Sequence, residues 1–246
     1  MIELLQGDCL EVMKGIPDGS IDAIITDPPY GTTACKWDSV IDFELMWEQL
    51  NRVIKPNGAI VLFGSEPFSS ALRMSNIKNY KYDWKWIKSR PSGHLNAKRM
   101  PLKNIEDICV FYKKQVEYNP QFTIGKPNNI KDGSIRKTKV TNNIYGEFKN
   151  TVQKRTDQKY PKQNLYFNQQ DPRKIIHPTQ KPVALMEYLI KTYTNEGETV
   201  LDFTMGSGST LVACDNLNRN GIGIEMDEAY FKIAEQRIKE NAHKLF

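Results

Sequence analysis

Residues 27–30, Asp-Pro-Pro-Tyr, place a carboxylate, a restrained backbone and an aromatic ring within four positions. The two prolines restrict φ and lack an N–H group, so the carbonyl groups beside them are held in place with few local partners. The Asp27 carboxylate and the Pro28 carbonyl could accept both hydrogens of an exocyclic amino group, while Tyr30 stacks on the planar ring that carries it. Because so short a motif also occurs in ordinary turns, this interpretation needs a second group of residues to support it.

A glycine-rich segment nearer the C-terminus supplies that second group. Residues 204–210, Thr-Met-Gly-Ser-Gly-Ser-Thr, follow an apolar segment typical of a buried strand and precede a helical pattern. Gly206 and Gly208 would let the backbone approach a ligand, and Glu225, which ends the next predicted strand, could bind two ribose hydroxyls. The succession predicts a nucleotide-binding unit, with an ordinary α/β crossover as the alternative.

The ligand of this unit is better matched by a nucleoside than by a dinucleotide. Leu211 stands where a dinucleotide-binding loop has its third glycine, and the segment lacks the lysine of a phosphate-binding P-loop. Asp202, at the end of the preceding strand, could hold an ammonium group of such a ligand.

Both groups of residues directly follow predicted strands, which must position them. Apolar segments predict buried strands at 2–6, 21–26, 59–63, 80–87, 105–112, 199–203 and 221–225. Helical spacing and start signals predict helices at 10–13, 43–54, 67–74, 183–193, 211–217 and 227–239. This alternation predicts an α/β fold with a doubly wound, mostly parallel sheet, in which ligands bind at the carboxyl ends of the strands.

Residues 113–175 interrupt the alternation and predict a small inserted module. They contain 14 Lys/Arg and 5 Asp/Glu, a surplus of nine positive charges, whereas the whole chain carries +5 and the remainder therefore −4. A basic insert on a mildly acidic body suggests a polyanionic partner, with a solvated lysine-rich surface as the alternative. The aromatic residues of the insert are more typical of its own small core than of a stacking surface. The predicted domains are thus 1–112 with 176–246, and the insert 113–175.

The composition argues against several other classes of protein. The four cysteines form no C-x-x-C pair and the three histidines are scattered, so neither a disulfide framework nor a metal site is expected. No apolar run approaches the length of a membrane span, and the N-terminus lacks a signal-peptide pattern. We therefore expect a reduced, cytoplasmic protein that binds neither a metal nor a membrane.

Together, the two motifs resemble those of the S-adenosylmethionine-dependent DNA amino-methyltransferases, which act on N6 of adenine or N4 of cytosine. The chain places residues 27–30 first, then the basic insert, then His-Pro-Thr-Gln-Lys-Pro at 177–182, and last the glycine-rich loop. This is the order of the permuted β class. The resemblance implies a Rossmann-like methyltransferase fold with a circularly permuted motif order and a small basic inserted module.

The resemblance also implies a cofactor and the residues that hold it. The cofactor would be S-adenosyl-L-methionine, with S-adenosyl-L-homocysteine as product and no metal. Glu225 would bind its ribose, Asp8 its adenine amine, and Lys181 its methionine carboxylate. The family loop usually has the sequence D-P-F-x-G-S-G-T, so Thr204 departs from it and leaves the usual aromatic contact unassigned. The full expected cofactor-binding set is Asp8, Cys9, Thr179, Gln180, Lys181, Asp202, Phe203, Thr204, Met205, Gly206, Ser207, Gly208, Ser209, Glu225 and Met226.

By the same resemblance, Asp27, Pro28, Pro29 and Tyr30 are the expected catalytic residues, acting on a base flipped out of double-stranded DNA. Adenine N6 is the favoured target because an Asp opens the motif. The alternatives are N4 of cytosine, a protein-glutamine methyltransferase, although that family has Asn at this position, and a non-catalytic regulator that binds cofactor and DNA.

The insert would recognise the target sequence in double-stranded DNA. Its expected DNA-binding residues are Lys126, Lys131, Arg136, Lys137, Lys139, Lys154 and Arg155. The family further allows a homodimer and a cognate restriction endonuclease as partners, in a bacterial or phage-encoded cytoplasmic system.

Overall fold

The computed structural model describes residues 1–32, 39–131, 133–136, 151–152, 154–169 and 180–242, with only the backbone of 135, 136, 151, 152 and 242. The chain divides into two compact units. The first comprises residues 1–119 and 162–246, and the second comprises residues 120–161. Within the described residues, no helix has both the length and the apolar character needed to cross a membrane.

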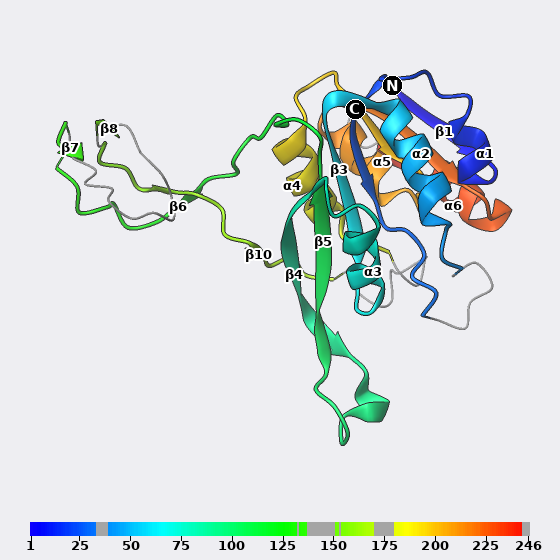
Figure 1. Ribbon diagram of the computed structural model, residues 1–246, viewed down its shortest axis with the longest axis horizontal. Coiled ribbons are helices and arrows are strands. Elements are labelled where there is room, and N and C mark those ends of the chain that lie inside the picture. The colour runs from blue at the N-terminus through cyan, green and yellow to red at the C-terminus, as the bar shows by residue number, and fades with distance from the viewer. Residues whose placement is uncertain (33–38, 132, 137–150, 153, 170–179, 243–246) are drawn as a thin grey trace. The chain divides into compact units, whose positions relative to one another are not determined.

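The first unit is built on an eight-stranded sheet with the order β1-β12-β11-β2-β3-β5-β4-β10 (Figure 1). Neighbouring strands are parallel throughout except for β5, which runs antiparallel to both β3 and β4. The prediction of a mostly parallel sheet is therefore confirmed. The strands are β1 (Ile2–Gln6), β2 (Ile21–Thr26), β3 (Ile54–Gly64), β4 (Tyr80–Ser92), β5 (Lys103–Phe111), β10 (Asn164–Leu165), β11 (Thr199–Asp202) and β12 (Asn220–Glu225).

Helices cover both faces of this sheet. They are α1 (Cys9–Met13), α2 (Phe43–Val53), α3 (Phe68–Ser75), α4 (Val183–Tyr193), α5 (Ser209–Asn216) and α6 (Glu228–Ala242). Successive side chains of a strand point to opposite faces, so Ile24 packs with the buried residues of α1, α2 and α3, and Ile25 packs with those of α4 and α5. Burial on both faces explains why β2 is an almost continuous apolar run.

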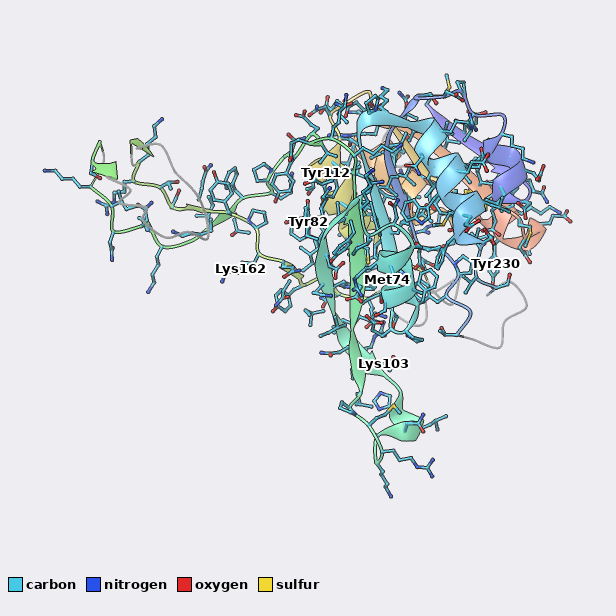
Figure 2. The ribbon with its side chains drawn as sticks, viewed as in Figure 1. Met74, Tyr82, Lys103, Tyr112, Lys162 and Tyr230 are labelled. Carbon is cyan, nitrogen blue, oxygen red and sulfur yellow. The ribbon has the colours of Figure 1, made fainter. Side chains whose placement is uncertain are left out.

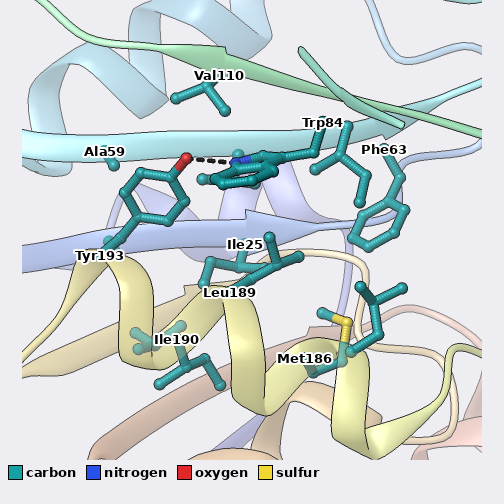
Figure 3. Packing of buried hydrophobic residues seen from close by; sticks show 14 of the residues in the cluster. Ile25, Ala59, Phe63, Trp84, Val110, Met186, Leu189, Ile190 and Tyr193 are labelled. Atoms are coloured by element: carbon teal, nitrogen blue, oxygen red, sulfur yellow. Dashed lines mark hydrogen bonds between the residues drawn. The ribbon is translucent and has the colours of Figure 1, made fainter. Parts of the chain in front are cut away.

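The core under α4 also contains a buried polar contact (Figure 3). Leu189 and Ile190 of α4 pack with Ile25 and other strand residues. At the end of the same helix, the Tyr193 hydroxyl accepts a 2.7 Å hydrogen bond from the Trp84 indole of β4. The polar atoms of both aromatic side chains are thus satisfied inside the core, as buried polar groups require.

The strand order also shows where the chain reverses direction across the sheet. From β11 the chain proceeds through α5 to β12, and α6 follows β12; β1 then lies beside β12, with the Gly7 amide donating to the Glu225 carbonyl at 3.0 Å. In space, β1 therefore continues the series of strands β11 and β12, although it comes first in the sequence. This is the predicted permuted order. Because β2 lies on the other side of β11, the switch point falls between β11 and β2, where open α/β sheets bind their ligands.

The second unit is built from two short antiparallel pairs, β6 (Thr123–Ile124) with β9 (Gln158–Lys159), and β7 (Ile135–Arg136) with β8 (Thr151–Val152). It is narrower than the insert predicted at 113–175. Val116 and Leu165 are buried in the core of the first unit, and β10 adds to its sheet. The insert was delimited in the sequence by its charge. Charge could not show that residues near 116 and 165 belong to the first unit, because individual apolar side chains make the contacts that hold them there.

Candidate active site

A cavity of about 200 Å³ opens at the switch point of the sheet. The turn after β2, which contains Asp27, and the loop after β11, which contains Gly206, both line it, together with Glu225 at the end of β12. The two groups of residues singled out in the sequence therefore face one cavity. The predicted residues in its lining are Asp8, Cys9, Asp27, Pro28, Pro29, Tyr30, Gln180, Lys181, Asp202, Phe203, Thr204, Met205, Gly206, Ser207, Ser209, Glu225 and Met226.

Two residues of the predicted catalytic and cofactor-binding sets are not part of this lining. Thr179 lies outside the described residues. Gly208 faces away from the cavity lining: a Cβ built on it would approach Ala234 of α6 at 3.2 Å, and its φ of +74° is in the left-handed region. Glycine is therefore required at Gly208 for the turn and for packing against α6.

The glycine loop and the acid at the end of β12 hold one another in place. The Gly206 amide donates to Oε2 of Glu225 at 2.9 Å, and the Asp227 amide donates to Oε1 at 2.8 Å. Burial raises the pKa of Glu225, while these two amides oppose the rise. Each carboxylate oxygen has two lone pairs, so both oxygens can still accept a hydroxyl hydrogen from a ligand.

The buried carboxylate of Asp202 also lines the cavity. It accepts hydrogen bonds from Thr26 Oγ1 at 2.9 Å, from Thr210 Oγ1 at 2.5 Å and from the Thr204 amide at 3.3 Å. Burial raises its pKa to about 6, against the effect of these donors, so the group is mainly ionised at neutral pH. A fixed negative charge at this position can attract a cationic group of a ligand.

Thr204, which departs from the family pattern, joins the two halves of the site. Its hydroxyl donates to the backbone carbonyl of Asp27 at 3.1 Å. The loop after β11 is therefore tied to the turn after β2. The apolar side chains of Phe203 and Met205, both nearly fully buried, line the cavity on either side of Thr204 in the sequence.

The Asp27 carboxylate belongs to a compact set of four charged side chains and one phenol, called here the Asp27 network: Asp27, Lys88, Glu106, Lys181 and Tyr30. The Tyr30 hydroxyl donates its hydrogen to Asp27 Oδ1 at 2.5 Å, and its oxygen also lies 3.0 Å from the second acceptor, Glu106 Oε1. The Lys181 ammonium pairs with Asp27 Oδ2 and lies 3.0 Å from Glu106 Oε1. Lys88 pairs with the other oxygen of Glu106 at 2.5 Å. Two carboxylates and two ammonium groups balance in formal charge.

The two carboxyl groups of this network are not equivalent. Burial raises the pKa of Asp27, and Lys181 offsets only part of that rise. Burial acts on Glu106 in the same direction, but Lys181 and Lys88 together hold its pKa below the usual value. The pKa of Lys181 is raised because Asp27 and Glu106 outweigh the effect of burial. Asp27 is therefore the more basic of the two carboxylates and the better proton acceptor.

Sequence reasoning did not identify Glu106 and Lys88 as site residues, and it expected Lys181 at a ligand carboxylate. In the structure the Lys181 ammonium pairs with two protein carboxylates, because burial makes unpaired charges costly. One signal was available: Glu106 and its neighbour Asp107 are acidic residues that directly precede the buried apolar positions 108–111 of the same strand. Buried acids are rare without partners, so Glu106 could have been marked for a cation.

Arg237 of α6 is a second residue that the sequence did not indicate. Its Nη1 donates to the Ser207 carbonyl at 2.9 Å, to Ser207 Oγ at 3.2 Å and to Ser209 Oγ at 3.0 Å. Burial lowers its pKa. One guanidinium group of α6 thus orders the glycine loop. No local sequence pattern could predict these contacts, because Arg237 lies far from the loop in the sequence.

The residues predicted to bind DNA lie in the second unit. Lys126, Lys131, Lys154 and Arg155 are exposed. The side chain of Arg136 is not described, and Lys137 and Lys139 lie outside the described residues. In the described part of the chain, no cluster of three or more His, Cys, Asp or Glu is arranged to hold a metal ion.

Comparisons with known proteins identify the family to which the chain belongs. The model of the N6/N4 DNA methylase family matches residues 21–236. The chain is 29% identical to the type II methyltransferase M.HpaI of Haemophilus parainfluenzae, over 96% of this chain and 73% of that protein, and 27% identical to M.HinfI of Haemophilus influenzae, over 96% and 68%.

Solved structures agree with this match. The crystal structure of an M1.HpyAVI–SAM complex is 29% identical, with a TM-score of 0.63, and covers 97% of this chain and 99% of that one. The cytosine-N4-specific PvuII DNA methyltransferase, at 17% identity and a TM-score of 0.64, shares the fold over 99% of this chain and 92% of that one. The chain belongs to the N6/N4 DNA methylase family.

Proposed function

We propose that this DNA methylase transfers a methyl group from S-adenosyl-L-methionine to the exocyclic N6 of adenine in DNA. The observation that carries the proposal is the shared cavity, which Asp27 and its turn line on one side and the glycine loop and Glu225 line on the other. A methyl donor and an amino group bound at these two sides would lie in one enclosure. Such positioning accounts for a large part of the rate enhancement in reactions between two bound reactants.

The residues present fit the cofactor, S-adenosyl-L-methionine. Glu225 keeps lone pairs for the ribose hydroxyls, and the buried Asp202 carboxylate offers a charge for the methionine ammonium group. Phe203 and Met205 supply apolar walls, and Asp8, the N-cap of α1, also lines the cavity. When bound, the cofactor supplies an electrophilic methyl group on a sulfonium. The remaining proposed contacts are Cys9, Gln180, Ser207, Ser209 and Met226.

Asp27 and Pro28 are proposed to hold the target amino group. In the described part of the chain, no protein group donates a hydrogen bond to the Pro28 carbonyl, which leaves it available to a substrate N–H. Asp27 has lone pairs beyond those that Tyr30 and Lys181 use. With its raised pKa, the Asp27 carboxylate is also suited to accept the proton that the amine loses on methylation.

Tyr30 is proposed to stack on the flipped base. One face of its ring packs on Phe68, with ring centroids 5.0 Å apart and an interplanar angle of 28°. Its hydroxyl is anchored by Asp27 and Glu106. A ring fixed in both ways provides a rigid surface for an extruded base, which reduces the entropy lost on binding.

Incubation with plasmid DNA and tritiated S-adenosylmethionine is expected to yield N6-methyladenine as the labelled base. The choice of adenine rests on the Asp that opens residues 27–30, and nucleoside analysis of digested DNA tests it directly. N4-methylcytosine as the product would contradict the assignment of adenine as the target base, but it would agree with methyl transfer to an exocyclic amino group. Absence of label from DNA, with cofactor binding preserved, would contradict the enzymatic proposal and favour a non-catalytic DNA-binding regulator.

Replacing Arg237 with methionine is expected to weaken cofactor binding by on the order of tenfold, because one hydrogen bond to a charged group contributes about 1.5–3 kcal/mol and Arg237 orders the loop through three contacts. Isothermal titration with S-adenosylhomocysteine measures the change. Lys232→Met, on the exposed side of the same helix, is the matched control, since Lys232 pairs with the exposed Glu228 and does not contact the glycine loop in the described residues. Equal affinities of the two variants for S-adenosylhomocysteine would show that Arg237 does not contribute to cofactor binding.

The second unit is proposed to recognise the target sequence. The exposed Lys126, Lys131, Lys154 and Arg155 support this role, since exposed cations on an insert are suited to phosphate contacts. We also propose a bacterial cytoplasmic protein, because the relatives come from Haemophilus species, with a cognate restriction endonuclease and a homodimer as further partners. Sedimentation and the identity of the neighbouring gene test the last two.

A further inference from the structure

The hairpin of β4 and β5 extends beyond the sheet as an arm. The two strands pair from Tyr80 opposite Phe111 to Ile87 opposite Ile105, and again at Ser92 opposite Lys103. Between them the chain turns through a short 3-10 helix at His94–Asn96. Figure 1 shows the hairpin projecting past the neighbouring end of β3. We call residues 88–103 the β4–β5 arm.

The charge of this arm has a single sign. It contains five basic residues, Lys88, Arg90, Lys98, Arg99 and Lys103, and no Asp or Glu. Lys98, Arg99 and Lys103 are exposed, and among the described residues none of these three pairs with a carboxylate (Lys103 is labelled in Figure 2). An unneutralised row of cations on a projecting element is complementary to a polyanion.

The tip of the arm is apolar as well as basic. The side chain of Leu95 is fully exposed and that of Met100 is about half exposed, so neither belongs to the core. Both side chains are therefore open to contact with a partner. In DNA-binding proteins, exposed apolar side chains beside cations contact base edges or partly enter base steps.

Topology places the arm at the catalytic edge of the sheet. Because β5 is antiparallel to both β3 and β4, β4 runs parallel to β3 and β2. The arm therefore leaves the sheet at the same edge as Asp27, which follows β2. At its base, Lys88 pairs with Glu106, and Glu106 hydrogen-bonds with Tyr30. A duplex that presents a base to Tyr30 would approach the protein at this edge of the sheet.

We propose that the β4–β5 arm binds the DNA duplex beside the flipped base, with Lys98, Arg99 and Lys103 on phosphates and Leu95 against the bases. The inference rests on the proposed function, since it takes DNA as the substrate of the Asp27 site. It adds a DNA-binding element within the first unit, separate from the basic second unit. Phosphate contacts of this kind fix the register of a protein on DNA without reading its sequence.

The test compares two triple variants of the full chain. The arm variant is Lys98→Ala/Arg99→Ala/Lys103→Ala. Its control is Lys78→Ala/Lys81→Ala/Lys114→Ala, three exposed lysines near the start of β4 and beyond the end of β5, at the opposite edge of the sheet. Fluorescence anisotropy with labelled duplex DNA and saturating S-adenosylhomocysteine gives affinity as a function of salt.

For the arm variant, the slope of log affinity against log salt is expected to fall in magnitude by about 3, one for each phosphate that the protein no longer neutralises, while the control keeps the wild-type slope. Leu95→Ser is expected to weaken binding several-fold with no change in slope, because it removes no charge. A wild-type slope for the arm variant overturns the proposal. So does an unchanged slope combined with a smaller sedimentation coefficient, which would assign the arm to an interface between copies of this chain.

Two controls separate failure of this inference from failure of the proposed function. Unchanged binding of S-adenosylhomocysteine and an unchanged melting temperature show that the arm variant is folded. If wild-type protein methylates plasmid DNA but the arm variant retains its salt dependence, only the arm assignment fails. If wild-type protein neither binds nor methylates DNA, the proposed function fails with it.

Discussion

Asp27→Ala is expected to lower the rate of methyl transfer by on the order of 10³-fold, because the target amine loses both a hydrogen-bond acceptor and a proton acceptor. Binding of S-adenosylmethionine is expected to stay close to wild type, since the cofactor side of the cavity is built by other strands. Single-turnover transfer of tritiated methyl groups measures the rate, and isothermal titration measures cofactor binding.

The variant Asp27→Asn refines this result. It preserves the shape and one acceptor oxygen but cannot take a proton, so a loss nearly as large would favour the proton-accepting role over simple positioning. Asp18→Ala is a suitable control, because Asp18 is exposed and, among the described residues, its ion-pair partner is Arg52 at the other edge of the sheet. Wild-type turnover by Asp27→Ala would refute the assignment of residues 27–30 as the catalytic turn.

The second large effect is expected for Lys181→Met. This change leaves the buried Asp27 and Glu106 carboxylates without their shared cation, so the free energy of unfolding should fall by about 3–5 kcal/mol at neutral pH. Without Lys181, the pKa values of both carboxyl groups rise. The acid limb of the pH–rate profile, which requires ionised Asp27, should therefore move to higher pH.

The sign of the pH dependence follows from proton binding. Carboxyl groups whose pKa is raised by folding bind more protons in the native state than in the unfolded chain, so stability is lost as pH rises above the ordinary value of about 4. The destabilisation of Lys181→Met should accordingly shrink as the pH falls from 8 towards 5. Denaturant unfolding at both pH values measures it.

Two further variants test whether the loss of a buried charge partner causes the destabilisation of Lys181→Met. Lys55→Met removes the partner of Asp22, but the Lys55 side chain is 39% exposed, so its cost should stay below about 1 kcal/mol. Lys181→Arg keeps the positive charge and should recover most of the stability. An equal loss for Lys181→Met and Lys55→Met, without pH dependence, would contradict the proposed charge balance in the Asp27 network.

Much of the fold was determined by local sequence. The apolar runs before Asp27 and before the glycine loop became β2 and β11, because a strand buried on both faces must be apolar at almost every position. Helix α4 begins directly after Pro182, as predicted, since proline suits the start of a helix and disfavours its interior. The order of the motifs also predicted the permuted arrangement, in which β1 pairs in parallel with β12.

Only the tertiary structure decided which charges meet. Glu106, Lys88 and Lys181 come from two strands and a segment before α4, and no local pattern reports that they converge on Asp27. The same holds for Arg237 behind the glycine loop. The limits of the second unit depend likewise on the burial of Val116 and Leu165. Periodicity reports which side chains of an element are buried, whereas the pairing of buried charges depends on distances between elements that only the packed fold defines.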